Sequence, residues 1–228
     1  MKVSSEFSKH AVDYGCYNVI QNRVVEKLLS FVQAKPKNIL DLGCGSGAVL
    51  KKIEWKLHHF VGVDFALGML ELHPKGKYIE CIYGNFNDAM LFKHLQTYSF
   101  DYIISASALQ WADDLECVFQ HILALNAPVA LTIFTAGTFK ILNETAKLKP
   151  ILHSRKRVEA LWKQYFPDAK FEVITYKLEF ESVRDMFRYI KKSGISGSRR
   201  VLSYKDMKKL MHAYPVNYLE FEVAFIAH

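Results

Sequence analysis

Short apolar runs alternate, along the middle of this 228-residue chain, with segments whose apolar residues have the spacing of helices. Strand and helix alternation of this kind predicts a parallel sheet with right-handed crossovers, so the expected fold class is α/β and doubly wound. The five runs typical of buried strands are Asn38–Leu42, His59–Asp64, Tyr78–Tyr83, Phe100–Ser105 and Ala127–Thr135.

The C-terminal part is expected to add helices and an antiparallel strand pair. Helices are expected at Thr138–Lys147 and Arg155–Phe166. Phe171–Phe180 and Val216–Ala227 alternate apolar and polar residues over the length of two long strands. This pair would complete a mostly parallel, seven-stranded sheet.

Two segments outside the sheet are expected to cover it. Residues 1–36 form an N-terminal helical arm in this interpretation, because Val19–Val32 carries an apolar stripe at helical spacing. Residues 182–214 form two amphipathic helices around a stretch rich in Gly, Ser and Arg, and we interpret them as a lid insertion. No linker or repeat divides the chain, so residues 1–228 are expected to form a single domain.

Three glycines at alternate positions, Gly43, Gly45 and Gly47, follow the first strand, and Ala48–Ile53 is expected to begin a helix. Glycine lets the backbone approach a ligand, so this arrangement predicts a nucleotide-type binding loop; the alternative is only a tight turn. Asp41 would repel a phosphate at such a loop, whereas it suits a cation. S-adenosylmethionine carries an ammonium and a sulfonium and no phosphate. The glycine spacing also differs from the dinucleotide fingerprint.

Polar and aromatic residues follow the second and third strands. Asp64 ends the second strand, where a carboxylate can accept two hydrogen bonds from a ribose diol. Its alternative role is to cap a helix at Ala66–Leu70. Asn85 and Phe86 follow the third strand, where Asn85 would accept from the adenine amino group and Phe86 would stack. The alternative there is an Asn-rich turn that caps the next helix through Asp88.

The fourth strand ends beside the predicted binding loop, where the reactive atom of a ligand should lie. Gln110 and Trp111 follow it and are candidates to wall a methyl-transfer site. Ordinary packing under the next helix is the alternative, more for Trp111 than for Gln110. Asp113 is expected to cap that helix, Leu115–Leu125.

Composition limits the classes of function. Half of the residues are hydrophobic, which suffices for a packed core, yet no apolar run is long enough to span a membrane. The first ten residues lack a signal core, so we expect a cytoplasmic protein. The nine histidines show no ligand spacing, and Cys16, Cys44, Cys81 and Cys117 show no paired spacing. Buried thiols are therefore expected rather than disulfides or a metal site.

The net charge of +7 makes an anionic partner plausible. Basic clusters gather in the C-terminal part, and each alone is usually a solvated face. Four of them favour an anionic macromolecule, although aromatic residues are not interleaved as in proteins that stack single-stranded bases. The clusters are Arg155–Arg157, Lys191–Lys192, Arg199–Arg200 and Lys208–Lys209.

With these residues in place, the chain resembles the class I S-adenosylmethionine-dependent methyltransferases. Within them it looks most like the malonyl-acyl-carrier-protein O-methyltransferases of biotin synthesis. Leu40–Gly47 and Val61–Leu70 match motifs of the whole class, whereas Leu109-Gln110-Trp111 is typical of the branch. Further matches to the branch are Phe7–Tyr14, Ile20-Gln21 and Val24, Asp114-Leu115, residues 182–185 and 194–200, and Glu222-Val223.

The chain also departs from the family's pattern at two places. It has Gly84-Asn85 where the family usually has an aspartate, which weakens the adenine assignment. It also has Asn126-Ala127-Pro128 where the family usually has a Pro-Gly-Gly turn. Neither departure lies at the methyl-donor end of the expected site.

The resemblance implies a Rossmann-like methyltransferase fold without a metal. It implies methyl transfer from S-adenosylmethionine to the free carboxylate of malonyl-acyl carrier protein, giving the ester that primes biotin synthesis. Tyr14 would cap the pocket, and Arg199 or Arg200 would bind the carboxylate bidentately. The acidic carrier protein would dock on Lys191, Lys192, Lys208 and Lys209. The implied cofactor contacts are Asp41, Gly43, Cys44, Gly45, Asp64, Phe65, Met69, Asn85, Phe86, Ser105 and Leu109.

Three other functions stay open. The first is a methyltransferase of the same fold that acts on a small acid or a quinone precursor. The second is nucleic-acid methylation, although the fourth strand lacks the Asn/Asp-Pro-Pro-aromatic loop used on base amino groups. The third is a non-catalytic S-adenosylmethionine-binding protein.

A malonyl carboxylate is ionised at neutral pH and needs no general base, which agrees with a chain that shows no Ser-His-Asp set.

Overall fold

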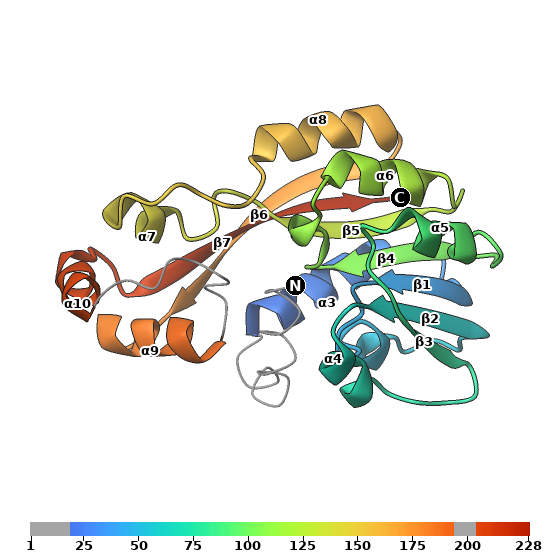
Figure 1. The fold of residues 1–228 in the computed structure, drawn as a ribbon, viewed down its shortest axis with the longest axis horizontal. Helices are drawn as coiled ribbons and strands as arrows, with labels where there is room; N and C mark the ends of the chain where they lie inside the picture. Colours follow the sequence, from blue (N-terminus) through green and yellow to red (C-terminus); the bar gives the residue numbers. More distant parts are fainter. Residues whose placement is uncertain (1–18, 194–203) are drawn as a thin grey trace.

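One seven-stranded sheet organises the part of the chain that the computed structural model describes, residues 19–193 and 204–228 (Figure 1). The strand order is β3-β2-β1-β4-β5-β7-β6. The first five strands pair in parallel, and β7 is antiparallel to β5 and β6. This confirms the doubly wound α/β fold and the closing antiparallel pair. The strands are β1 Asn38–Leu42, β2 His59–Asp64, β3 Ile79–Tyr83, β4 Tyr102–Ala106, β5 Val129–Phe134, β6 Lys170–Glu179 and β7 Tyr218–Ala227.

Helices cover both faces of the sheet. In Figure 1, α6 and α8 lie along the upper face of the sheet, and α3 and α9 lie below it. The helices are α3 Val19–Phe31, α4 Leu67–Leu72, α5 Ala89–Leu95, α6 Leu115–Leu123, α7 Lys140–Thr145, α8 Arg155–Tyr165, α9 Val183–Ser193 and α10 Tyr204–Ala213, with the short 3-10 helices η1 Leu50–Lys52 and η2 Leu109–Trp111.

Strand β1 shows how the two faces are assigned. Successive side chains of a strand point to opposite faces. Ile39 packs in the core under α3, whereas Leu40 and Leu42 pack in the core under α6. Asp41 follows Ile39 by two positions, so its side chain lies on the α3 face. The central strands are buried on both faces, which is why their sequences are almost continuously apolar.

Two sequence expectations near the loops are wrong. Ala48–Ile53 does not begin an α-helix, because only η1 forms and Ile53 is already extended. The connection to β2 is short, and Trp55 ties it back by donating from Nε1 to the Pro36 carbonyl at 2.7 Å. The cap of α6 is Asp114 rather than Asp113. Asp114 Oδ1 accepts from the backbone N–H of Glu116 at 2.9 Å, whereas the Asp113 N–H donates to Asn87 Oδ1.

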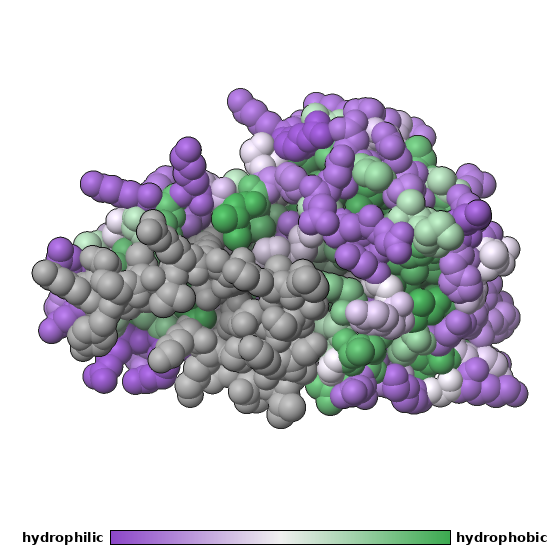
Figure 2. Space-filling view, in the orientation of Figure 1, coloured by the Kyte–Doolittle hydropathy of each residue, from purple (hydrophilic) through white to green (hydrophobic). Residues whose placement is uncertain are grey.

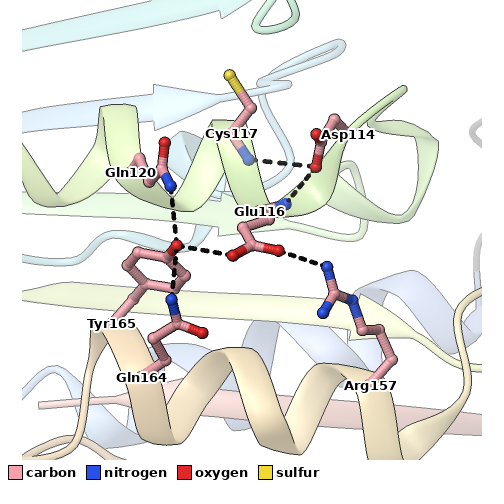
Figure 3. Close-up of polar contacts among 7 residues, drawn as sticks. All are labelled: Asp114, Glu116, Cys117, Gln120, Arg157, Gln164 and Tyr165. Atoms are coloured by element: carbon pink, nitrogen blue, oxygen red, sulfur yellow. Dashed lines mark hydrogen bonds and ion pairs between the residues drawn. The ribbon is translucent and has the colours of Figure 1, made fainter.

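Glu116 joins α6 to α8 on the outer face (Figure 3). Its carboxylate accepts from Arg157 Nη2 at 2.6 Å and from the Tyr165 hydroxyl at 3.0 Å. The bond from Arg157, and then the bond from Tyr165, lower the pKa of Glu116. Phe119 and Phe166 meet edge to face behind this network, with ring centroids 5.2 Å apart. The contacts of Glu116 with Arg157 and Tyr165 fix α8 against α6, just before β6 begins.

The surface is mostly hydrophilic on the face shown in Figure 2. Hydrophobic atoms reach it where Figure 1 places α4, which carries the exposed Leu67 and Leu72. Among the described residues, no helix combines the length and the apolar character that crossing a membrane requires.

Candidate functional site

A cleft opens at the carboxyl ends of the parallel strands. It lies between the glycine loop, the ends of β2 and β4, and helix α3. This is the edge at which open α/β sheets bind ligands. The residues that line it are Gln21, Val25, Gly43, Cys44, Gly45, Ser46, Ala48, Asp64, Phe65, Met69, Phe86, Ala106, Ser107, Ala108 and Trp111.

The glycine loop needs its glycines for two different reasons. Gly43, Gly45 and Gly47 all have φ in the left-handed region, at 77°, 52° and 82°. Gly43 is also in close contact, because a Cβ there would lie 2.2 Å from the Cβ of Ala108. A Cβ on Gly45 would meet no protein atom within 4 Å. Gly43 therefore lets the β4 loop pack against the turn, whereas Gly45 leaves open space in the cleft.

Asp64 joins the glycine loop to the end of β2. Its Oδ2 accepts from the Gly45 N–H, and its Oδ1 accepts from the Ala66 N–H, both at 2.8 Å. Burial raises its pKa, and the backbone hydrogen bonds oppose that rise. The carboxylate thus holds the turn before α4, but it does not cap the helix, because the N-cap of α4 is Ala66 and no side chain caps it. Each oxygen keeps a further lone pair for a ligand hydroxyl.

Asp41 is fully buried at the base of the glycine loop. Neither of its carboxyl oxygens has a hydrogen-bond partner among the described residues. Burial, and then the neighbouring Asp64 carboxylate, raise the pKa of Asp41 well above its ordinary value. Buried polar atoms are nearly always paired in folded proteins. The two oxygens therefore suit a hydrogen-bond donor on a ligand, preferably one that carries positive charge.

The segment after β4 carries an unusual backbone conformation and two unpaired acceptors. Ser107 adopts a left-handed φ of 61°, as four other non-glycine residues among the described residues also do, and it is the one of these that lines the cleft. Gln110 Nε2 donates to the Ser107 carbonyl at 2.6 Å, so Gln110 Oε1 faces away as an acceptor. Gln110 Oε1 and Ser107 Oγ are buried without a partner among the described residues. Ser107 and Trp111 line the cleft, whereas the buried Gln110 is not among its lining residues.

The other predicted cofactor contacts divide into two groups. Cys44, Phe65, Met69 and Phe86 line the cleft. Three others are engaged elsewhere and do not line it. The Ser105 hydroxyl donates to the Leu42 carbonyl at 2.6 Å, Leu109 packs in the core, and the exposed Asn85 accepts from the Asn87 N–H at 3.0 Å. Asp88 caps α5, as the turn alternative expects.

The residues predicted to meet the substrate are only partly described. Tyr14, Arg199 and Arg200 lie outside the described residues. Lys191 and Lys192 belong to α9, but their side chains are not described. Lys208 and Lys209 are exposed on α10. Within residues 19–193 and 204–228, no group of three His, Cys, Asp or Glu side chains is arranged to hold a metal ion.

Seven of the lining residues were not predicted as site residues from the sequence: Gln21, Val25, Ser46, Ala48, Ala106, Ser107 and Ala108. Gln21 interrupts an apolar stripe between Ile20 and Val24, and that interruption was the available signal. Ser107 gave no signal, because serine does not by itself encode a left-handed conformation.

Comparison with known proteins adds a domain match and several relatives. A family model described as a methyltransferase domain matches residues 39–128. The malonyl-[acyl-carrier protein] O-methyltransferase of Legionella pneumophila is 24% identical in an alignment of length 209 that covers 85% of this chain and 74% of the relative. The Geobacter sulfurreducens protein of the same name is 32% identical in an alignment of length 166 that covers 68% of this chain and 61% of the relative. The one from Brevibacillus brevis is 26% identical in an alignment of length 232 that covers 92% of this chain and 77% of the relative.

Solved structures support the fold at low identity. The YcgJ protein from Bacillus subtilis has a TM-score of 0.61 at 11% identity, covering 90% of this chain and 98% of its own. The plantazolicin methyltransferase BpumL, solved with a desmethyl analog and SAH, has a TM-score of 0.57 at 13% identity, covering 99% and 94%. At such identities the likeness concerns the fold alone.

Proposed function

We propose that this chain, a class I S-adenosylmethionine-dependent methyltransferase by its matched domain, its fold and its relatives, methylates the free carboxylate of malonyl-acyl carrier protein. A carboxylate oxygen attacks the methyl carbon of the donor, and the bond from that carbon to sulfur breaks with its electron pair passing to sulfur. The products are a methyl ester and S-adenosylhomocysteine. No proton has to move in this step.

The observation that carries this proposal is the state of the titratable groups in the cleft. Among the described lining residues, Cys44 and Asp64 titrate. Burial raises the pKa of the Cys44 thiol, so it stays neutral at pH 7. Asp64 is engaged by the N–H groups of Gly45 and Ala66. This pattern suits an acceptor that arrives already ionised, as a malonyl carboxylate does at neutral pH.

The donor side of the cleft suits a cation. Asp41 offers two buried acceptors without a partner among the described residues. In this proposal Asp64 accepts from the ribose hydroxyls and Phe86 stacks on the adenine. Gln110 and Trp111 wall the methyl group and align it with the incoming oxygen, which accounts for most of the rate acceleration in a reaction without acid–base steps.

The acceptor side rests on the resemblance and on charge. Arg199 or Arg200 would hold the malonyl carboxylate, and Tyr14 would close the pocket from the arm. The carrier protein is acidic, so Lys191, Lys192, Lys208 and Lys209 on α9 and α10 would speed its encounter. The helices between β6 and β7 would then act as a lid over the cleft.

The direct test is incubation with labelled S-adenosylmethionine and malonyl-acyl carrier protein, with malonyl-coenzyme A and free malonate as parallel acceptors. Base-labile label on the carrier protein is the expected result. Label on none of the three would overturn the proposal. Labelling of a small acid or a quinone precursor instead would establish the alternative acceptor.

A charge-reversal pair tests the docking face. The double variant Lys208→Glu with Lys209→Glu should raise KM for the carrier-bound substrate about tenfold, because steering of this kind changes encounter rates by that order. KM for malonyl-coenzyme A should stay unchanged. Lys56→Glu with Lys93→Glu, also on exposed lysines, serves as the matched control. Equal effects of the two double variants would contradict docking on α10.

A further inference from the structure

Gln21 places an amide on a helix face that is otherwise apolar. Its neighbours Ile20, Val24 and Val25 are buried in the core. Gln21 and Val25 lie one turn apart on α3, and both line the cleft. The Gln21 Oε1 atom is buried and has no hydrogen-bond partner among the described residues. A glutamine that served only the packing of α3 would be expected to have one.

Gln21 lines the cleft together with the glycine loop, and the strand that leads into that loop carries a second group without a partner among the described residues. Asp41 lies on the α3 face of the sheet, and both of its oxygens are also unpaired within the described residues. Acceptor oxygens cannot satisfy one another. A ligand that brings N–H donors and positive charge between α3 and the glycine loop would supply the missing donors.

We propose that Gln21 holds the amino-acid end of the methyl donor. Its Oε1 accepts from the donor's ammonium group beside Asp41, and its Nε2 donates to the donor's carboxylate. A carboxamide suits this zwitterion because it presents one acceptor and two N–H donors on a single planar group. The inference rests on the methyl-donor binding of the proposed function, and it does not depend on which acceptor is methylated.

The test compares ligands that keep or lack the amino-acid end, by calorimetric titration of the full chain. Gln21→Leu should weaken S-adenosylmethionine and S-adenosylhomocysteine about 10- to 100-fold, as expected for lost hydrogen bonds to charged groups. Methylthioadenosine, which lacks the amino acid, should bind both proteins within about twofold of each other. Gln33→Leu, at an exposed glutamine beyond α3, is the matched control and should change none of the three affinities.

A second variant distinguishes hydrogen bonding by Gln21 from an effect of its side chain on the shape of the cleft. Gln21→Glu keeps the size and the acceptor but repels the donor's carboxylate. It should bind S-adenosylmethionine more weakly than the wild type does, and decarboxylated S-adenosylmethionine at least as tightly. If Gln21→Leu lowers the melting temperature sharply, this variant carries the test alone.

Two results would overturn the inference. One is an equal loss for all ligands, including methylthioadenosine, which would mean that Gln21 only shapes the cleft. The other is unchanged affinity for S-adenosylmethionine in both variants. A wild-type protein that binds the donor but methylates none of the acceptors would instead remove the proposed acceptor and leave the Gln21 inference standing.

Discussion

Gly43 and Gly45 form a matched pair, because both have left-handed φ values but only Gly43 is in close contact with another segment. Replacing either by alanine forces an L-residue into that conformation. Only Gly43→Ala also drives its Cβ to 2.2 Å from the Cβ of Ala108. The two variants therefore separate backbone strain from steric overlap at a single turn.

The loss of stability in each variant is estimated from backbone strain and steric overlap. Left-handed strain costs about 1–2 kcal/mol for either variant. Overlap with Ala108 adds about 1–3 kcal/mol to Gly43→Ala alone. In a chain of this size each kcal/mol lowers the melting temperature by about 2–4 °C. With about 2 kcal/mol between the variants, Gly43→Ala should melt roughly 6 °C below Gly45→Ala.

Thermal unfolding by calorimetry or circular dichroism measures the difference, and Ala108→Gly tests its cause. Removing the Ala108 Cβ leaves the alanine Cβ at position 43 in ordinary contact with the Ala108 Cα at 3.7 Å and Phe86 Cε1 at 3.9 Å. The double variant Gly43→Ala with Ala108→Gly should therefore recover the overlap term, a coupling of about 1–3 kcal/mol. Equal melting of Gly43→Ala and Gly45→Ala, or no recovery in the double variant, would refute the reasoning. Gly45→Ala should mainly weaken donor binding, because its Cβ enters the cleft.

Two further predictions concern pH. Burial raises the pKa of Asp41 above its ordinary 3.8, so the folded state binds a proton that the unfolded chain has released, and stability falls as pH rises through the raised pKa. Asp41→Asn should therefore melt above the wild type by a margin that grows as pH rises from about 4 and levels off above the raised pKa, while it loses donor affinity in titrations; a margin independent of pH would contradict this. The pKa of Glu116 is lowered from 4.5 in the folded chain. Its contribution to the stability of the fold is therefore present above pH 4.5 and is lost as pH falls through the lowered pKa. Glu116→Gln should melt below the wild type at pH 7 but not at about pH 3, and less so in 1 M salt, whereas the exposed control Glu54→Gln should show no such trend.

The sequence alone was enough to predict the elements that depend on local periodicity. The run at His59–Asp64 is short and apolar, and it forms β2 with the same bounds. The alternation in Val216–Ala227 predicted an antiparallel partner for Phe171–Phe180, and β6 and β7 pair in this way. Local patterns succeed here because the period of a strand or helix is written in consecutive residues.

Local pattern failed where a neighbouring segment decides the outcome. Ala48–Ile53 has the spacing of a helix, yet the short return to β2 and the bond from Trp55 to Pro36 limit it to η1. Asp113 and Asp114 can both cap a helix with a carboxylate. In the structure Asp114 caps α6, and the Asp113 N–H instead donates to Asn87 from the loop after β3.

The glycine loop and the acid that precedes it were readable in the sequence, because glycine spacing and a carboxylate are properties of the chain itself. Only the tertiary structure decided that Asp41 lies buried on the α3 face with its oxygens unpaired within the described residues, and that Gln21 lines the cleft with the glycine loop. Likewise, only the folded chain brings Gly43 against Ala108. These relations join segments far apart in sequence, so they depend on strand order and helix packing rather than on any local period.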